Sequence, residues 1–180
     1  MYELGPAQGR VAIRTSRAGL AARAGHDLLI EVTRWEARVE VPGEGDVAAA
    51  SITAELDLGS LAVREGTGGA RPLTASDRAD IEKTMRKILA SGTEPATASF
   101  RSTRVITSNV GGAIEGTATF HGRSQPVRLQ VQEPAPGRYR GTAAVQQTAF
   151  GITPYTGFLG ALKLRDEITV EFDLDLAAKS

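Results

Sequence analysis

The stretch Ile168-Thr169-Val170-Glu171-Phe172-Asp173-Leu174-Asp175-Leu176 alternates strictly between apolar and polar side chains. Because successive side chains of an extended strand point to opposite faces, this period of two predicts a strand with one dry face and one wet face. The pattern recurs through much of the chain. We therefore expect a mainly β protein, an antiparallel sheet curled around its own apolar interior.

Seven further segments show similar alternation: residues 11–15, 28–41, 52–58, 97–106, 113–121, 127–131 and 139–149. Within 28–41 the apolar phase moves from even positions to odd ones, which predicts a β-bulge or sharp bend near Thr33-Arg34. About eight strands is the number at which a barrel can enclose one small ligand. The expected architecture is an eight-stranded antiparallel barrel forming a single domain over residues 1–180.

One amphipathic helix is predicted between the strands. Thr74 or Ser76 can cap it, Asp77 stands where the helix dipole favours negative charge, and glycines over 65–72 predict a preceding loop. An apolar stripe follows at helical spacing, formed by Ile81, Met85, Ile88 and Leu89. Met85 and Leu89 are candidates to line the barrel interior.

Composition excludes several classes of function. Lys+Arg 21 balances Asp+Glu 21, so net charge predicts no attraction to nucleic acid or to an anionic membrane. Cys is absent, which excludes disulfides and thiolate sites. The chain has no apolar run of transmembrane length and no visible signal peptide, so we expect no stable membrane insertion and a cytoplasmic location, or export if a leader has been removed.

The interior is expected to be hollow, because several inward positions carry small residues. These are Ala54, Ala98, Gly116, Ala118, Gly141 and Ala143. Empty apolar volume is unfavourable, so a ligand with an apolar body would occupy such a space. The alternative is that the helix stripe fills it. The apolar, glycine-punctuated segment 150–164 is expected to be a loop that lines a portal, caps the core or meets a partner.

Four segments resemble those of the YceI-like family, in the same order along the chain. They are Asp57-Leu58-Gly59-Ser60-Leu61, Ser99 to Val105, Gly116 to Gly122 followed by Gln125-Pro126-Val127, and Phe150-Gly151-Ile152. The resemblance implies a lipocalin-like barrel that holds a long isoprenoid, a quinone or a similar amphiphile. Many members of that family are exported to the periplasm.

The predicted ligand-binding residues line an apolar pocket, with His26 at its mouth. They are Ile30, Val32, Leu56, Phe100, Phe120, Val145, Phe150, Tyr155, Phe158, Phe172 and His26. His26 could bind a head group or make a structural hydrogen bond, whereas His121 is expected to be a turn residue. Arg17, Arg23 and Arg71 are candidates for an anionic head group, or ordinary surface arginines.

No hydrolase, nucleotide-binding or metal-ligand motif is present in the sequence. We therefore expect a non-enzymatic carrier or store of a hydrophobic or amphiphilic small molecule, with no cofactor, no metal and no nucleic-acid partner. Two alternatives remain. One is a barrel enzyme, an isomerase or hydrolase, with His26 as its base; the other is a solid barrel whose apolar loop forms a protein interface, as in a homodimer.

Overall fold

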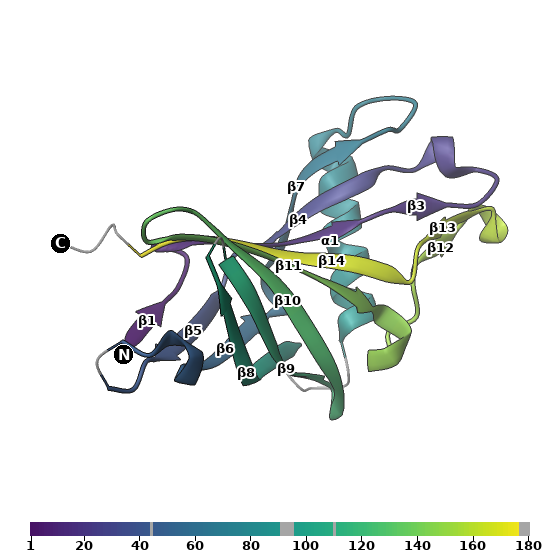
Figure 1. Cartoon of the computed structure of the whole chain (residues 1–180). Helices are drawn as coiled ribbons and strands as arrows, with labels where there is room; N and C mark the ends of the chain where they lie inside the picture. The colour runs from purple at the N-terminus through teal and green to yellow at the C-terminus, as the bar shows by residue number, and fades with distance from the viewer. Residues whose placement is uncertain (44, 91–95, 110, 177–180) are drawn as a thin grey trace.

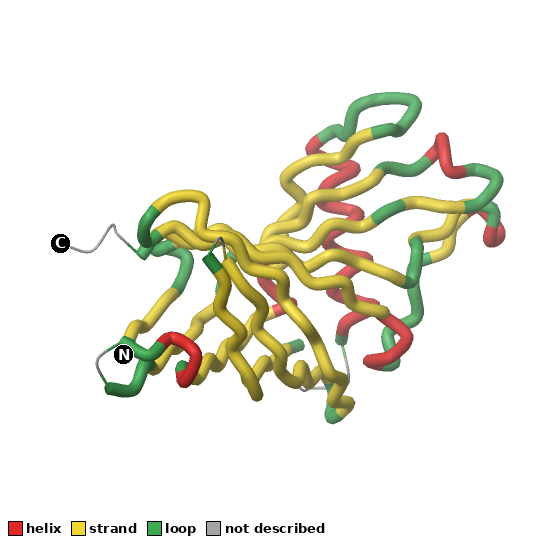
Figure 2. Tube along the Cα trace, in the orientation of Figure 1, coloured by secondary structure: helices red, strands yellow, loops and turns green. Residues whose placement is uncertain are grey.

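A computed structural model describes residues 1–43, 45–90, 96–109 and 111–176. In this part of the chain, one antiparallel sheet of eleven strands curls into a half-barrel, with a single α-helix beside it and a small three-stranded sheet at one end (Figures 1 and 2). The mainly β, antiparallel fold with one helix, expected from the alternating sequence, is confirmed.

The elements have the following bounds. The large sheet contains β1 (Tyr2–Leu4), β2 (Gly9–Thr15), β4 (Asp27–Val32), β5 (Trp35–Glu40), β6 (Ser51–Asp57), β7 (Leu61–Thr67), β8 (Thr97–Ser108), β9 (Gly111–Phe120), β10 (Arg123–Ala135), β11 (Arg138–Gln146) and β14 (Glu167–Asp175). The small sheet contains β3 (Arg17–Ala18), β12 (Thr156–Gly157) and β13 (Leu162–Leu164). The helices are α1 (Ala75–Leu89) and the 3-10 turns η1 (Ala22–Ala24), η2 (Val47–Ala49), η3 (Leu58–Ser60), η4 (Gln147–Phe150) and η5 (Phe158–Gly160).

The strand count differs from the eight expected, and the reason is a bend. The large sheet has the order β1-β5-β6-β8-β9-β10-β11-β14-β2-β4-β7. β4 runs into β5, and β6 runs through η3 into β7, so four of the eleven strands are halves of two long ones. With the three-residue β1 set aside, eight long strands remain, which agrees with the number of alternating segments in the sequence.

The bend lies at Thr33-Arg34, where the sequence changes phase. Val32 pairs with Leu61 and Trp35 pairs with Leu56, so two residues on one strand face four, residues 57–60, on the other. The buried Ser60 holds the corner: its Oγ accepts the Arg34 amide at 2.9 Å and donates to the Asp57 carbonyl at 2.7 Å. The predicted bend is thus confirmed as a corner of the sheet.

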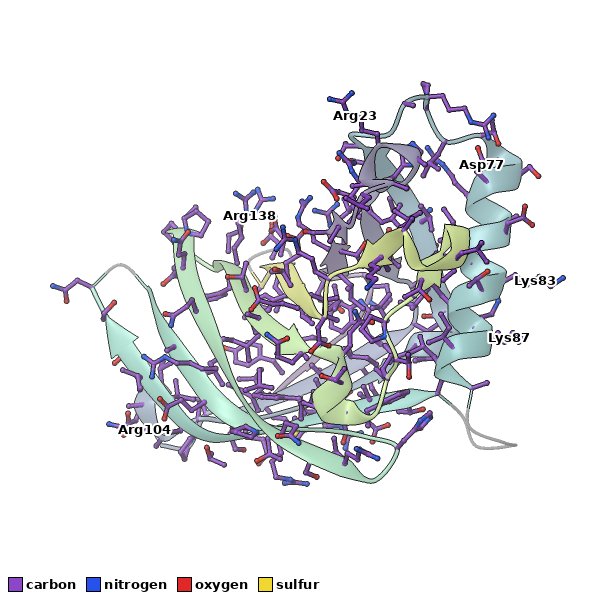
Figure 3. All side chains as sticks on the ribbon, turned by 90° about the vertical axis from the view of Figure 1, so that its right-hand side faces the viewer. Arg23, Asp77, Lys83, Lys87, Arg104 and Arg138 are labelled. Atoms are coloured by element: carbon purple, nitrogen blue, oxygen red, sulfur yellow. The ribbon has the colours of Figure 1, made fainter. Side chains whose placement is uncertain are left out.

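α1 covers the open edge beside β7. Thr74 caps it in a capping box with Asp77, which satisfies backbone groups at the helix start. Ile81, Met85 and Leu89 pack on the buried core, while Lys83 and Lys87 point away from the sheet (Figure 3). The helix therefore fills part of the interior at this end. This agrees with the alternative prediction that the apolar stripe of the helix fills the barrel.

The outer face of the sheet is crossed by ion pairs. Glu171, on the wet face of β14, pairs with Arg14 of β2 at 2.8 Å, and Asp173 pairs with Arg140 of β11 at 2.8 Å. Such exposed pairs contribute at most about 1 kcal/mol each. They show which way the opening stretch faces: its acidic residues lie outside and its apolar residues inside.

Candidate functional site

One half of the barrel interior is a sealed core. Leu28, Ile30, Val32, Leu61 and Val63 are buried there, together with Phe120 and Phe150. Among the predicted ligand-binding residues, Ile30, Val32, Phe120 and Phe150 thus belong to this core, and Leu56, Val145 and Phe172 are partly buried residues packed against it. These seven side chains therefore pack against protein in this structure.

The other half of the interior is an apolar wall that remains partly exposed. The strand register places its side chains on the inner face, because residues paired directly across an antiparallel ladder point to the same side. Ile114 pairs with Leu129 and Val105, and Val131 pairs with the buried Gly141. The members of this wall, which lie outside the buried core cluster, are Ile52, Phe100, Val105, Ile114, Val127, Leu129 and Val131.

We call these seven side chains the apolar wall. They come from β6, β8, β9 and β10, the strands that curve around the half-barrel on the left of Figure 3, where Arg104 of β8 points away from the sheet. Seven neighbouring, partly exposed apolar side chains on a concave surface are unusual unless something covers them. Phe100 is the predicted site residue that belongs to this wall.

Two of the small residues that were expected to leave interior space free are instead covered by aromatic rings. A Cβ at Gly116 would lie 2.4 Å from Cζ of Phe100, and one at Gly141 would lie 2.3 Å from Cε1 of Phe172. The absence of a side chain at each glycine lets the ring approach the backbone closely. This interior volume is therefore occupied by protein at both positions, and the available surface is the wall itself.

Polar groups on the inner face are few. Ser102 Oγ accepts the Ile52 amide at 2.8 Å, and the Gln125 side-chain amide donates to the Ala149 carbonyl at 3.1 Å. Tyr139 pairs with Leu174 and so faces inward at the end of the wall. Burial raises the pKa of Tyr139, and the negative Glu133 carboxylate, which its hydroxyl contacts, raises that pKa further. The Tyr139 hydroxyl therefore stays protonated and neutral. Tyr139 is not among the site residues predicted from the sequence.

Two hollows lie at the same end as Tyr139. One of about 170 Å³ lies between the N-terminal strand and Leu176, and one of about 350 Å³ lies between Met1 and the β5–β6 connection. None of the seven residues of the apolar wall lines either hollow. Among the described residues, no group of three or more His, Cys, Asp or Glu side chains is placed to hold a metal ion.

His26 lies at the opposite end, before β4. Its Nε2 is 2.6 Å from the Arg71 carbonyl oxygen, which can only accept, so Nε2 is the donor. A Cβ at Gly69 would lie 2.2 Å from the same nitrogen, which shows how closely the loop packs on the ring. His26 thus joins two loops through a structural hydrogen bond, one of the two roles considered from sequence. His121, the other histidine, has φ 47° in the β9–β10 turn and stacks on Phe120 at 3.8 Å.

The candidate head-group arginines also gather at the His26 end. Arg17 donates to the Thr67 carbonyl at 2.7 Å and lies 3.7 Å from Asp27, and Arg71 lies 3.5 Å from Asp77. Arg23 is exposed at the tip of its loop (Figure 3). The structure brings all three to one end of the barrel, away from the apolar wall.

The apolar segment 150–164 lies at this end too. Phe150 is buried and anchors the segment, Tyr155 is 40% exposed, and Leu159 is fully exposed. The backbone at Phe158 belongs to η5, but its side chain lies outside the described part of the structure. The segment is therefore partly a cap on the core and partly an outward-facing tip.

Comparison with known proteins identifies the same architecture. The family model for the YceI-like domain matches residues 2–176. The crystal structure of Burkholderia cenocepacia BcnA is similar, with a TM-score of 0.60 and 15% identity over 92% of this chain and 94% of that one. A mutant CJ YCEI protein with a monobromobimane guest has a TM-score of 0.56 and 11% identity over 81% of each chain. At such identities the likeness concerns the fold. A comparison with curated proteins gave no match.

Proposed function

The chain belongs to the family of YceI-like domains, and we propose that it binds an amphiphilic, lipid-like molecule against its apolar wall. The ligand class is an isoprenoid chain, a prenylated quinone or a similar molecule with a long apolar body. The protein acts on it as a carrier or store, without covalent chemistry. The observation that carries the proposal is the partly exposed apolar wall of β6, β8, β9 and β10.

Apolar burial provides the driving force. Covering apolar surface contributes about 25 cal/mol per Å², so each 100 Å² covered contributes about 2.5 kcal/mol before the cost of association. A flexible apolar chain can follow a curved sheet without directional contacts. The wall offers side chains of this kind from four strands, whereas its polar neighbours Ser102 and Gln125 are already hydrogen-bonded within the protein.

Binding can be measured by fluorescence because Trp35 is the only tryptophan of the chain and lies in the buried core. Titration with a prenylated quinone, which quenches indole emission at short range, should reduce Trp35 fluorescence in a saturable way. A short quinone without the prenyl chain serves as the reference ligand. Saturable quenching by the prenylated quinone alone supports binding through the apolar body.

A matched pair of variants tests the position of the site. Leu129 is on the wall, and Gln130, its neighbour on β10, is exposed on the opposite face of the same strand. Leu129→Asp should weaken quinone binding about tenfold or more, since a carboxylate on the wall must be desolvated, while Gln130→Asp should leave it unchanged. Equal affinities for the two variants would remove the wall as the site.

A further inference from the structure

Three loops join at the end of the barrel opposite Tyr139. They are residues 17–26, 66–73 and 153–165, and we call their combined surface the loop face; they lie side by side at the upper right of Figure 1. The Ala21 amide donates to the Ala161 carbonyl at 3.0 Å, and the Ala70 amide donates to the Arg23 carbonyl at 3.0 Å. These hydrogen bonds hold the three loops together as one surface.

Two leucines project from neighbouring tips of the loop face. Leu20 is 101% exposed and Leu159 is 109% exposed, more than other large apolar side chains of the described residues. β3 and β13, beside them, pair Ala18 with Lys163, so the two tips are adjacent. Leu159 also has φ 53°, a left-handed conformation that disfavours a leucine and suits asparagine or glycine. The chain thus holds a large apolar residue in a position where a polar one would be less strained.

The charge of the loop face is one-sided although the whole chain is neutral. Its three segments contain Arg17, Arg23, Arg71, Lys163 and Arg165 and no acidic residue. Acidic residues adjoin the segments: Asp27 follows His26, Glu65 precedes Gly66 and Asp166 follows Arg165. Asp27 lies near Arg17, and Asp77 lies near Arg71. Arg23, Lys163 and Arg165 are exposed and belong to the same segments as the two leucines. Net charge therefore underestimates the local attraction of this end for anions.

We propose that the loop face docks on the surface of an anionic phospholipid bilayer. Leu20 and Leu159 enter the boundary between head groups and acyl chains, and Arg23, Lys163 and Arg165 contact the phosphates. Exposed apolar side chains surrounded by basic ones are the composition that suits this interface. The described residues include no helix with the length and apolar composition of a membrane span. The proposed contact is made at the bilayer surface by side chains of the three loops. None of these residues belongs to the apolar wall, so the proposal is independent of the ligand site.

Co-sedimentation with vesicles tests the proposal. Wild-type protein should sediment with vesicles of phosphatidylcholine containing phosphatidylglycerol, less at high salt, and much less with phosphatidylcholine alone. The double variant Leu20→Asn and Leu159→Asn should lose about tenfold or more of the bound fraction. Asparagine tolerates the left-handed backbone at position 159, so the variant should fold at least as well as wild type.

A matched control replaces two other exposed apolar side chains, away from the loop face. Tyr2 is 49% exposed and Val47 is 53% exposed, and Tyr2→Asn with Val47→Asn should sediment like wild type. The proposal is overturned if wild type ignores the anionic vesicles or if the leucine double variant binds them as wild type does. It is also overturned if wild type instead forms a dimer that the leucine variant abolishes, since the loop face would then serve a second copy. Leu129→Asp should retain sedimentation, so failure of the wall proposal is distinguishable.

Discussion

Gly141→Ala should destabilise the protein, although a strand glycine replaced by alanine is ordinarily stabilising by about 0.5–1 kcal/mol. The reason is the ring of Phe172, which lies against the glycine from the paired position on β14. A Cβ at residue 141 would be 2.3 Å from Cε1 and 2.4 Å from Cζ of that ring. Favourable carbon–carbon contacts need about 3.5–4.0 Å, so the ring must move by about 1 Å or more.

The expected magnitude follows from this overlap. Overpacking of a core typically costs about 1–3 kcal/mol. Because Phe172 is only partly buried, its ring has some freedom to move, which favours the lower half of that range. The free energy of unfolding should be measured by urea denaturation, followed through the fluorescence of Trp35. The substitution should lower the midpoint without changing the slope.

A double-mutant cycle shows whether the ring is the cause. In a Phe172→Val background the overlap is absent, so Gly141→Ala should become neutral or stabilising, with a coupling energy of about 1–3 kcal/mol. The reasoning is refuted if Gly141→Ala stabilises the wild type. It is also refuted if the substitution has the same effect in both backgrounds, because the cost would then come from the backbone.

Three further predictions concern the corner, the helix and the histidine. Ser60→Ala should destabilise the protein by about 0.5–1.5 kcal/mol, because two partly buried backbone groups lose their hydrogen-bond partner. Urea unfolding against a Ser60→Thr control will measure this. Hydrogen bonds from the backbone and side chain of Thr74 lower the pKa of Asp77. The ionised Asp77 carboxylate therefore stabilises the fold fully above about pH 4, and this stabilisation is lost as the pH falls through the lowered pKa. In Thr74→Ala the free energy of unfolding should therefore depend less on pH between neutral and acid conditions. An unchanged pH dependence would show that the capping box is not the source of this stabilisation. His26→Ala should lower thermal stability by freeing the Arg71 carbonyl while leaving quinone affinity intact; loss of turnover of any substrate in that variant would instead support the enzyme alternative.

Much of the fold follows from local pattern. Period-two alternation gives β14 directly, and the phase change at Thr33-Arg34 locates the corner because a one-residue shift must move side chains between faces. β7 is absent from the predicted strands since it follows the corner turn at residues 58–60, contains Gly66 and is followed by Gly68 and Gly69. Its continuation to Thr67 depends on pairing with β4, a long-range contact that local sequence does not encode.

The site is less accessible to sequence reasoning. Small inward residues such as Gly116 and Gly141 occur both beside empty space and where an aromatic ring packs on the backbone. Only the three-dimensional structure shows that Phe100 and Phe172 pack there. The ligand-binding residues predicted from the sequence are largely aromatic, whereas the apolar wall is mostly aliphatic and includes Ile114 and Leu129. Their inward phase is readable in the sequence, but their partial exposure depends on the curvature of the whole sheet.

The central claim is that the apolar wall holds an amphiphile, and mass spectrometry of co-purified lipid tests it most directly. Protein purified from its native host should be heat-treated and extracted with organic solvent, and the extract compared with that of Leu129→Asp prepared in the same way. The account predicts one isoprenoid, quinone or similar amphiphile per wild-type chain and a strongly reduced amount in the variant. A wild-type extract without stoichiometric lipid, or equal lipid in both proteins, would contradict it.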